Sequence, residues 1–81
     1  MMTTFTVLYF GLLAERRGLA EERVDSAATT AAELYAELDA RHGLGLSIAH
    51  FRVAVNDEFA AWDGGIKSGD VVAFLPPMSG G

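Results

Sequence analysis

The end of the chain carries the most specific chemistry in this sequence. Met78-Ser79-Gly80-Gly81 follows Pro76-Pro77 and ends in a carboxylate on a residue that has no side chain. An arm that ends in two glycines can enter a channel too narrow for any Cβ atom. Adenylation by ATP on an activating enzyme would make the Gly81 carboxylate electrophilic, and sulfide attack on the acyl adenylate would then give a thiocarboxylate. For the glycine pair taken alone, the alternative is a frayed end without function.

Other residues with reactive side chains form weaker patterns. His42 and His50 lack the Asp/Glu spacing of a metal-ligand set, so a helix end and a loop explain them. Asp57 and Glu58 are adjacent and would face opposite sides of a strand, which favours a solvated turn over a carboxylate dyad. Gly64-Gly65 lacks the helix and lysine of a phosphate loop and is interpreted as a flexible connection. The chain has no cysteine, so sulfur chemistry would need sulfur from elsewhere, and no metal site is expected.

Length, composition and charge limit the classes of function. The chain has 81 residues, of which 51% are hydrophobic, and this predicts one globular domain. The net charge of −5 comes without a cluster of basic residues, so we expect no nucleic-acid partner. No apolar run is long enough to span a membrane, and Met1-Met2-Thr3-Thr4 lacks the basic start of a secretory signal. These features predict a cytoplasmic protein whose acidity serves solubility or attraction to a basic partner.

Several stretches have the residue types of strands. Residues 5–10 and 51–56 begin with apolar and polar residues in alternation, which predicts strands with one face in the core. Residues 71–75 are nearly all apolar, which predicts a central strand buried on both sides. Residues 21–25 are polar enough for an edge strand, and residues 58–60 form a short strand after the turn residues Asn56-Asp57.

One main helix is expected between these strands. Thr30 and Glu33 form a capping-box pattern, in which the Thr30 hydroxyl accepts from the Glu33 amide and the Glu33 carboxylate accepts from the Thr30 amide. An apolar stripe at helical spacing follows, ending before Gly43: Ala31, Leu34, Tyr35, Leu38 and His42. Residues 12–17 before Gly18 predict a single short helical turn. The order of elements predicts an α+β fold of the β-grasp, or ubiquitin-like, architecture over residues 1–75, with a reactive tail over residues 76–81.

The base of the tail is the expected contact with a partner. Pro76-Pro77 cannot extend a sheet because proline lacks the amide hydrogen. An apolar collar that anchors in a partner is predicted there, continuing into Ser79: Phe74, Leu75, Pro76, Pro77 and Met78. For Phe74, packing in the core is an equal alternative.

Two segments resemble the MoaD/ThiS sulfur-carrier family, and within it the small subunits of molybdopterin synthase. The segments are Val53-Ala54-Val55-Asn56-Asp57 and residues 68–81, which read SGDVVAFLPPMSGG. The double proline before the terminal glycines is typical of the molybdopterin branch, whereas carriers of the thiamin pathway share the glycines and usually lack it. The N-terminal half departs more from the family pattern and supports the fold rather than the branch.

The resemblance implies a sulfur carrier that is not catalytic alone. Gly81 would be adenylated by an E1-like enzyme, with AMP as a transient acyl adenylate and no stably bound cofactor, while Gly80 lets the tail thread. A sulfur donor protein would load the thiocarboxylate. The chain would then dock into the large subunit, in a heterotetramer, and give sulfur to the cyclic pyranopterin precursor of the molybdenum cofactor. Alternatives are sulfur delivery to thiamin, cysteine or tRNA, a ubiquitin-like protein modifier, and a β-grasp binding module that does not need its glycines.

Overall fold

The strands and the two α-helices follow one another along the chain in the order expected from the sequence. The computed structural model describes residues 2–76. Within that range its elements are β1 (Thr3–Tyr9), α1 (Leu12–Arg17), β2 (Glu21–Ser26), α2 (Ala31–His42), the 3₁₀ helix η1 (Ile48–His50), β3 (Arg52–Val55), β4 (Glu58–Ala60) and β5 (Val71–Leu75). Of these, η1 was not predicted.

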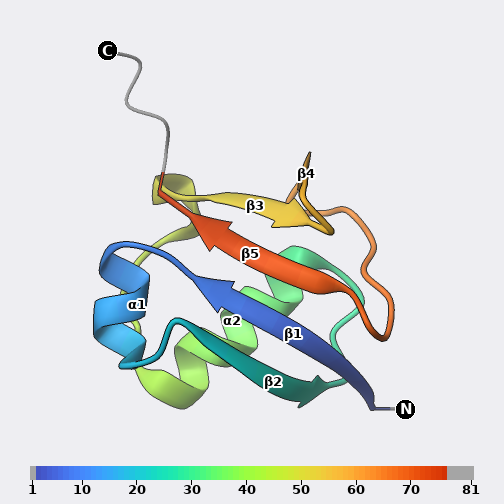
Figure 1. The fold of residues 1–81 in the computed structure, drawn as a ribbon, viewed down its shortest axis with the longest axis horizontal. Helices are drawn as coiled ribbons and strands as arrows, with labels where there is room; N and C mark the ends of the chain where they lie inside the picture. Colours follow the sequence, from blue (N-terminus) through green and yellow to red (C-terminus); the bar gives the residue numbers. More distant parts are fainter. Residues whose placement is uncertain (1, 77–81) are drawn as a thin grey trace.

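All five described strands form one mixed sheet in the order β2-β1-β5-β3-β4 (Figure 1). β1 and β5 are parallel and adjacent at its centre, with Tyr9 opposite Phe74, and the other pairs are antiparallel. The polar strand β2 lies at one edge, as its composition predicted. The sheet with α2 across one face is the predicted β-grasp architecture, which is thereby confirmed.

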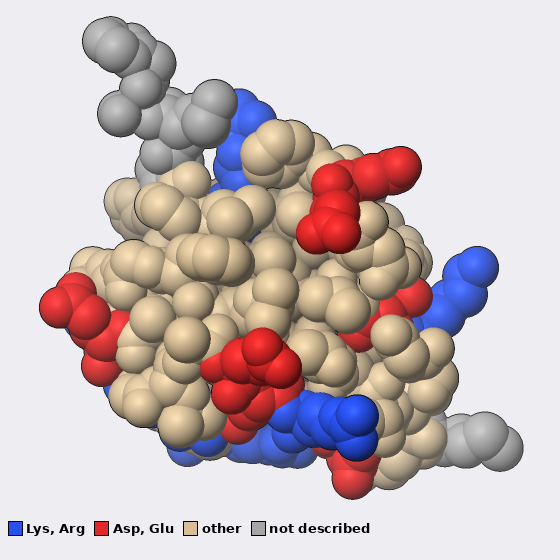
Figure 2. Space-filling view, in the orientation of Figure 1, with Lys and Arg blue, Asp and Glu red and all other residues tan. Residues whose placement is uncertain are grey.

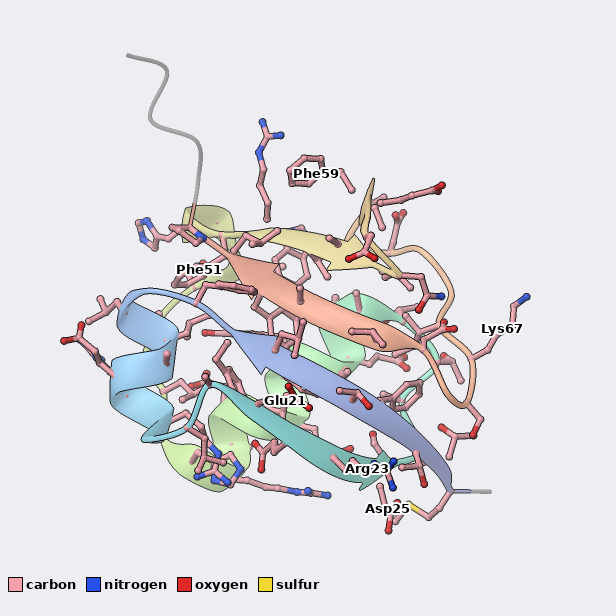
Figure 3. The ribbon with its side chains drawn as sticks, viewed as in Figure 1. Glu21, Arg23, Asp25, Phe51, Phe59 and Lys67 are labelled. Carbon is pink, nitrogen blue, oxygen red and sulfur yellow. The ribbon has the colours of Figure 1, made fainter. Side chains whose placement is uncertain are left out.

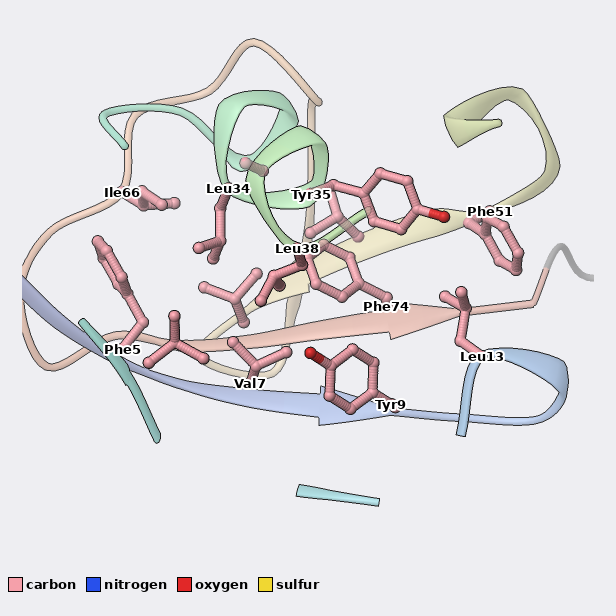
Figure 4. Close-up of a cluster of buried hydrophobic side chains, with 14 of the residues drawn as sticks. Phe5, Val7, Tyr9, Leu13, Leu34, Tyr35, Leu38, Phe51, Ile66 and Phe74 are labelled. Atoms are coloured by element: carbon pink, nitrogen blue, oxygen red, sulfur yellow. The ribbon is translucent and has the colours of Figure 1, made fainter. Parts of the chain in front are cut away.

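The core lies between α2 and the face of the sheet that the helix covers (Figure 4). Alternate residues of β1 and β5 point into it, and the predicted stripe of α2 packs onto them: Phe5, Val7, Tyr9, Val72 and Phe74 from the sheet, and Ala31, Leu34, Tyr35 and Leu38 from the helix. His42 closes the helix but stays half-buried. Packing of two apolar faces therefore explains why this short chain folds.

The N-terminus of α2 differs in detail from the predicted capping box. The Thr30 hydroxyl accepts from the Glu33 amide at 3.1 Å, as expected. The Glu33 carboxylate instead accepts from the amide and the hydroxyl of Thr29, at 2.8 and 2.9 Å. The carbonyl of Trp62 accepts from the amide of Ala32 at 2.8 Å, so the loop before β5 also caps the helix.

The glycines of that loop are part of the packed structure. The carbonyl of Gly64 accepts from the Ala31 amide at 3.3 Å, and Gly65 forms a bridge with Thr30. A Cβ atom on Gly64 would lie 3.0 Å from the carbonyl oxygen of Ala61. The interpretation of Gly64-Gly65 as a simple flexible connection is therefore corrected, since close approach of the backbone requires the first glycine.

The face of the sheet opposite α2, here called the open face, has no helix over it in the described part of the chain (Figure 1). Val71, Ala73 and Leu75 of β5 lie on the open face and are only half-buried, whereas Val72 and Phe74 are fully buried. β5 is central in the sheet as predicted, but the prediction that both of its sides are buried is wrong. Its apolar composition serves the core on one face and leaves an apolar surface on the other.

Candidate functional site

Strand β5 delivers the chain directly to the base of the predicted tail. Leu75 is the last residue of the β5 ladder and lies opposite Arg52 of β3, and the exposed Pro76 follows it. The backbone of Gly11 passes beside this proline, because a Cβ atom on Gly11 would lie 3.8 Å from Cγ of Pro76. Gly81, Gly80, Ser79, Met78 and Pro77 lie outside the described residues, so their predicted roles stay predictions.

Phe74 anchors the tail base from within the core. Its side chain is fully buried, and its ring stacks on Trp62 at 5.9 Å between centroids and meets the edge of Tyr35 at 5.3 Å. A ring held on several sides cannot reach a partner without opening the core. The structure thus favours the core alternative for Phe74 and corrects its assignment as a partner-binding residue. Leu75 is half-buried on the open face and Pro76 is exposed, so both are accessible to a partner, as partner-binding residues must be.

An apolar surface adjoins the tail base on the open face. Its strand residues are Leu8, Phe59, Val71, Ala73 and Leu75, together with Ala54, which is on the same face but buried beside them. Phe10 and Leu12 follow β1 on either side of Gly11. Phe59 is 63% exposed, and Phe10 and Leu12 are 42% and 46% exposed. Figure 2 shows that the centre of this face carries neither acidic nor basic side chains, which gather toward β2 and the rim. We call these eight residues the apolar half of the open face.

Sequence reasoning missed Phe10, Leu12 and Phe59 as candidate contact residues. A usable signal was present, because residues 7–10 are apolar at every position and a strand with only one buried face cannot bury them all. Phe59 was harder to find, since its place on the open face depends on its pairing with Ala54. Exposed aromatic side chains on one apolar face are typical of protein contact surfaces.

The β3–β4 turn and the start of β5 are fastened together by side chains. Asn56 and Asp57 have φ values of 52° and 71°, which is the backbone of a type I′ hairpin turn. The Asn56 side chain donates to Asp70 Oδ1 at 3.0 Å, and its oxygen accepts from the Val71 amide at 2.9 Å. Asp70 Oδ2 accepts from the Lys67 amide at 2.8 Å. We call this the Asn56 clip, and it gives a structural reason for both segments that resemble the sulfur carriers.

A second polar cluster joins α1 to the sheet. The Glu22 carboxylate accepts from the Tyr9 hydroxyl at 2.6 Å and from two nitrogens of Arg17 at 2.8 and 2.7 Å. The hydrogen bonds from Arg17 hold the pKa of Glu22 below its usual range. Burial, with the hydrogen bond to Glu22, raises the pKa of Tyr9 well above its usual range. The cluster ties three elements together and is structural.

The histidines and the remaining acidic pair show no assembled reactive centre. His42 Nε2 lies 4.0 Å from Glu22 Oε2, and His50 is exposed in η1. Asp57 lies in the hairpin turn, and Glu58 is the exposed first residue of β4. Over residues 2–76, no group of three or more potential metal ligands comes together, and no pocket is found. No helix in the same range is both long and apolar enough to cross a membrane.

Comparisons with known proteins agree with the fold and the motifs. The sequence profile of the ThiS family matches residues 7–81. A putative molybdopterin converting factor subunit 1 from Pyrococcus furiosus superposes with a TM-score of 0.78 and 27% identity, covering 94% of this chain and 99% of its own. SAMP1 from Haloferax volcanii gives a TM-score of 0.77 and 30% identity, over 96% of this chain and 99% of its own.

A further match is a protein solved with a partner. It comes from the complex of subunits 1 and 2 of molybdopterin-converting factor from Helicobacter pylori, with a TM-score of 0.64, 30% identity, and coverage of 98% and 100% of the two chains. A comparison with curated protein sequences gives no match. The profile match covers nearly the whole chain, and the fold and the motifs agree with it. The chain therefore belongs to the ThiS family, the MoaD/ThiS group of ubiquitin-like sulfur carriers.

Proposed function

We propose that this chain is the sulfur-carrier subunit of molybdopterin synthase. The observation that carries the proposal is the delivery of Leu75 and Pro76 by a central strand to an exposed end of the sheet, beside an apolar surface. The Phe-Leu-Pro-Pro sequence at this point, typical of the molybdopterin branch, supports the choice of pathway, as does the likeness to the P. furiosus and H. pylori proteins.

The proposed chemistry takes place at Gly81 in two steps. A carboxylate oxygen of Gly81 attacks the α-phosphorus of ATP on an E1-like enzyme, and pyrophosphate leaves. Sulfide (HS⁻), supplied by a sulfur donor protein, then attacks the acyl carbon and AMP leaves, so that the carboxylate becomes a thiocarboxylate. AMP is a transient substituent, and the chain itself holds no cofactor. The fold supplies a fixed base for the arm and a surface for the enzymes that act on it.

The acceptor step would occur in a larger partner in the cytoplasm. The tail enters the large subunit of molybdopterin synthase, in a heterotetramer, where the thiocarboxylate gives its sulfur to the cyclic pyranopterin precursor. Pro76 and Leu75, with Pro77, Met78 and Ser79, line the entrance to that subunit. The large subunit provides the substrate pocket, and Gly80 allows the arm to pass through a narrow channel.

Intact mass spectrometry tests this function. The chain is incubated with its cognate activating enzyme, ATP and a sulfide source, and a variant without Gly81 serves as the control. We expect the mass gain of one oxygen replaced by sulfur in the full chain only. No gain, with an activating enzyme that loads a known carrier, would refute sulfur carriage.

The second candidate function is protein modification through Gly81. The observation that favours it is the 30% identity to SAMP1, the small archaeal modifier protein 1 of H. volcanii. Both functions use an activated C-terminal acyl group and differ in the acceptor, sulfur or an amine. Conjugates of higher mass, linked through Gly81 to lysines of other proteins in cells, would favour the modifier.

A further inference from the structure

Arg52 is not paired within the described part of the chain, unlike three of the other arginines. Arginines 16, 17 and 41 are each engaged within the chain, with the Leu44 carbonyl at 2.8 Å, with Glu22 at 2.7 Å and with Glu37 at 2.6 Å. The exposed Arg52 is in no ion pair within residues 2–76. Its guanidinium carbon lies 5.5 Å from the centre of the Phe59 ring, so the aromatic face holds the cation in place.

The neighbours of Arg52 on the open face are uncharged. Leu75 lies opposite it on β5, and Ala54 and Phe59 lie next to it on β3 and β4. Arg23, the other exposed arginine without an ion pair in this range, lies between Glu21 and Asp25 on the edge strand β2. Figure 3 shows these three β2 residues at the opposite edge of the sheet from Phe59. Arg52 is therefore an isolated cation within an apolar surface, beside the base of the tail.

A protein that covers this surface must provide a group for the guanidinium. Burial of an unpaired charge is strongly unfavourable, and so is the removal of one partner from a buried ion pair. The planar guanidinium matches a carboxylate, which can accept two parallel hydrogen bonds from it. Elsewhere, the chain with its net charge of −5 disfavours acidic groups on a partner. A partner carboxylate is thus favoured at Arg52 and disfavoured over most of the remaining surface, which gives both orientation and selectivity.

We propose that Arg52, held over Phe59 beside Leu75, is a specificity residue of the docking surface and pairs with an Asp or Glu of the subunit that receives the tail. The inference rests on the proposed function, because it takes that subunit as the occupant of the apolar half of the open face. Arg52 contacts the partner directly and takes no part in the chemistry at Gly81.

Affinity for the purified large subunit of the same organism tests the pairing. The dissociation constant is measured by titration calorimetry at 50 and 300 mM NaCl for the full chain and for R52Q, R52E and R52K. R23Q and R23E are the matched controls, since they make the same changes on the same face at the other edge. We expect losses of affinity at low salt of about 10-fold for R52Q and about 100-fold for R52E. The loss for R52K, which keeps the charge without the planar fork, should be smaller than that for R52Q. The controls should stay within about twofold, and salt should weaken R52Q less than the wild type.

The outcomes separate this inference from the proposed function. Affinities of R52Q and R52E within twofold of the wild type, or equal losses for R52E and R23E, would overturn the pairing even if the thiocarboxylate forms. Arg52-dependent binding without thiocarboxylate formation would leave the pairing in place and remove the proposed function. If the wild-type chain does not bind the large subunit at all, the inference is wrong.

Discussion

The Asn56 clip predicts a stability difference between two substitutions at one position. Asn56→Ala removes the two side-chain hydrogen bonds to Asp70 and Val71 and replaces asparagine, which tolerates the left-handed φ of 52°, by alanine, which does not. Exposed hydrogen bonds of this kind contribute about 0.5–1 kcal/mol each, and a left-handed conformation costs a non-glycine residue about 1–2 kcal/mol. The expected loss for Asn56→Ala is therefore about 2–4 kcal/mol.

Asn56→Gly separates the two contributions. Glycine adopts the same φ without strain, so only the hydrogen bonds and the greater freedom of the unfolded chain count against it. We expect this variant to be about 1 kcal/mol more stable than Asn56→Ala, which corresponds to roughly 4–8 °C in Tm for a domain of this size. Asp57→Gly is the matched control: it has a φ of 71° and should be neutral or slightly stabilising, because Asn-Gly is the preferred pair in a type I′ turn.

Urea unfolding followed by the fluorescence of Trp62 measures these differences. Trp62 is the single tryptophan of the chain and stacks on the buried Phe74, so its emission reports on the core. Equal losses for Asn56→Ala and Asn56→Gly would show that left-handed strain contributes nothing. A loss below about 0.5 kcal/mol for both would show that the clip does not hold β5 to the hairpin.

Three further predictions concern the core, the polar cluster around Glu22 and the alternative function. Phe74→Ala should lower the free energy of unfolding by about 3–5 kcal/mol, with the exposed Phe59→Ala as a control within about 1 kcal/mol; similar values would contradict the core assignment of Phe74. Because the folded-state pKa of Glu22 is lowered, its contribution is complete above the usual carboxyl pKa of about 4.3 and is lost as the pH falls through the lowered value. The stability gap between wild type and Glu22→Gln should shrink over that acid range in chemical denaturation, and a constant gap would disprove the linkage. If the chain conjugates to copies of itself, the only side-chain amine available is that of Lys67, so mass spectrometry should find no side-chain-linked dimers for Lys67→Arg.

Local signals in the sequence predicted most of the fold. Thr30 and Gly43 marked the two ends of α2, and the alternation in residues 52–55 marked β3, because these patterns depend on neighbouring residues only. The sharing of Glu33 with Thr29, the capping of α2 by Trp62 and the exposed face of β5 were not predicted. The capping by Trp62 and the exposure of β5 depend on contacts between residues far apart in the chain, which a local pattern does not contain. Thr29 and Glu33 are four residues apart, and their hydrogen bonds are a local alternative to the predicted bond from Thr30.

The candidate site also has one part that residue types reveal and another part that only the fold reveals. The terminal glycines and Pro76 could be singled out from residue types alone, since their chemistry lies in the covalent structure of the chain. The surface around them could not, because Phe59 and Arg52 become neighbours of Leu75 only through the register of β3 with β4 and β5. Sequence reasoning also placed Phe74 in the collar beside Leu75, although alternation along β5 turns these two residues to opposite faces.

The opposite orientations of Phe74 and Leu75 affect how the arm is positioned for transfer of its terminal group. A buried Phe74 fixes the end of β5, so the base of the arm keeps a constant position relative to Arg52 and Phe59. The reach of the terminal carboxylate beyond the docking surface is then set by the number of residues after Leu75. Docking and reactivity therefore depend on different parts of the chain. Changes on the open face alter which partner binds and how tightly, and changes in arm length alter whether Gly81 reaches the reacting group.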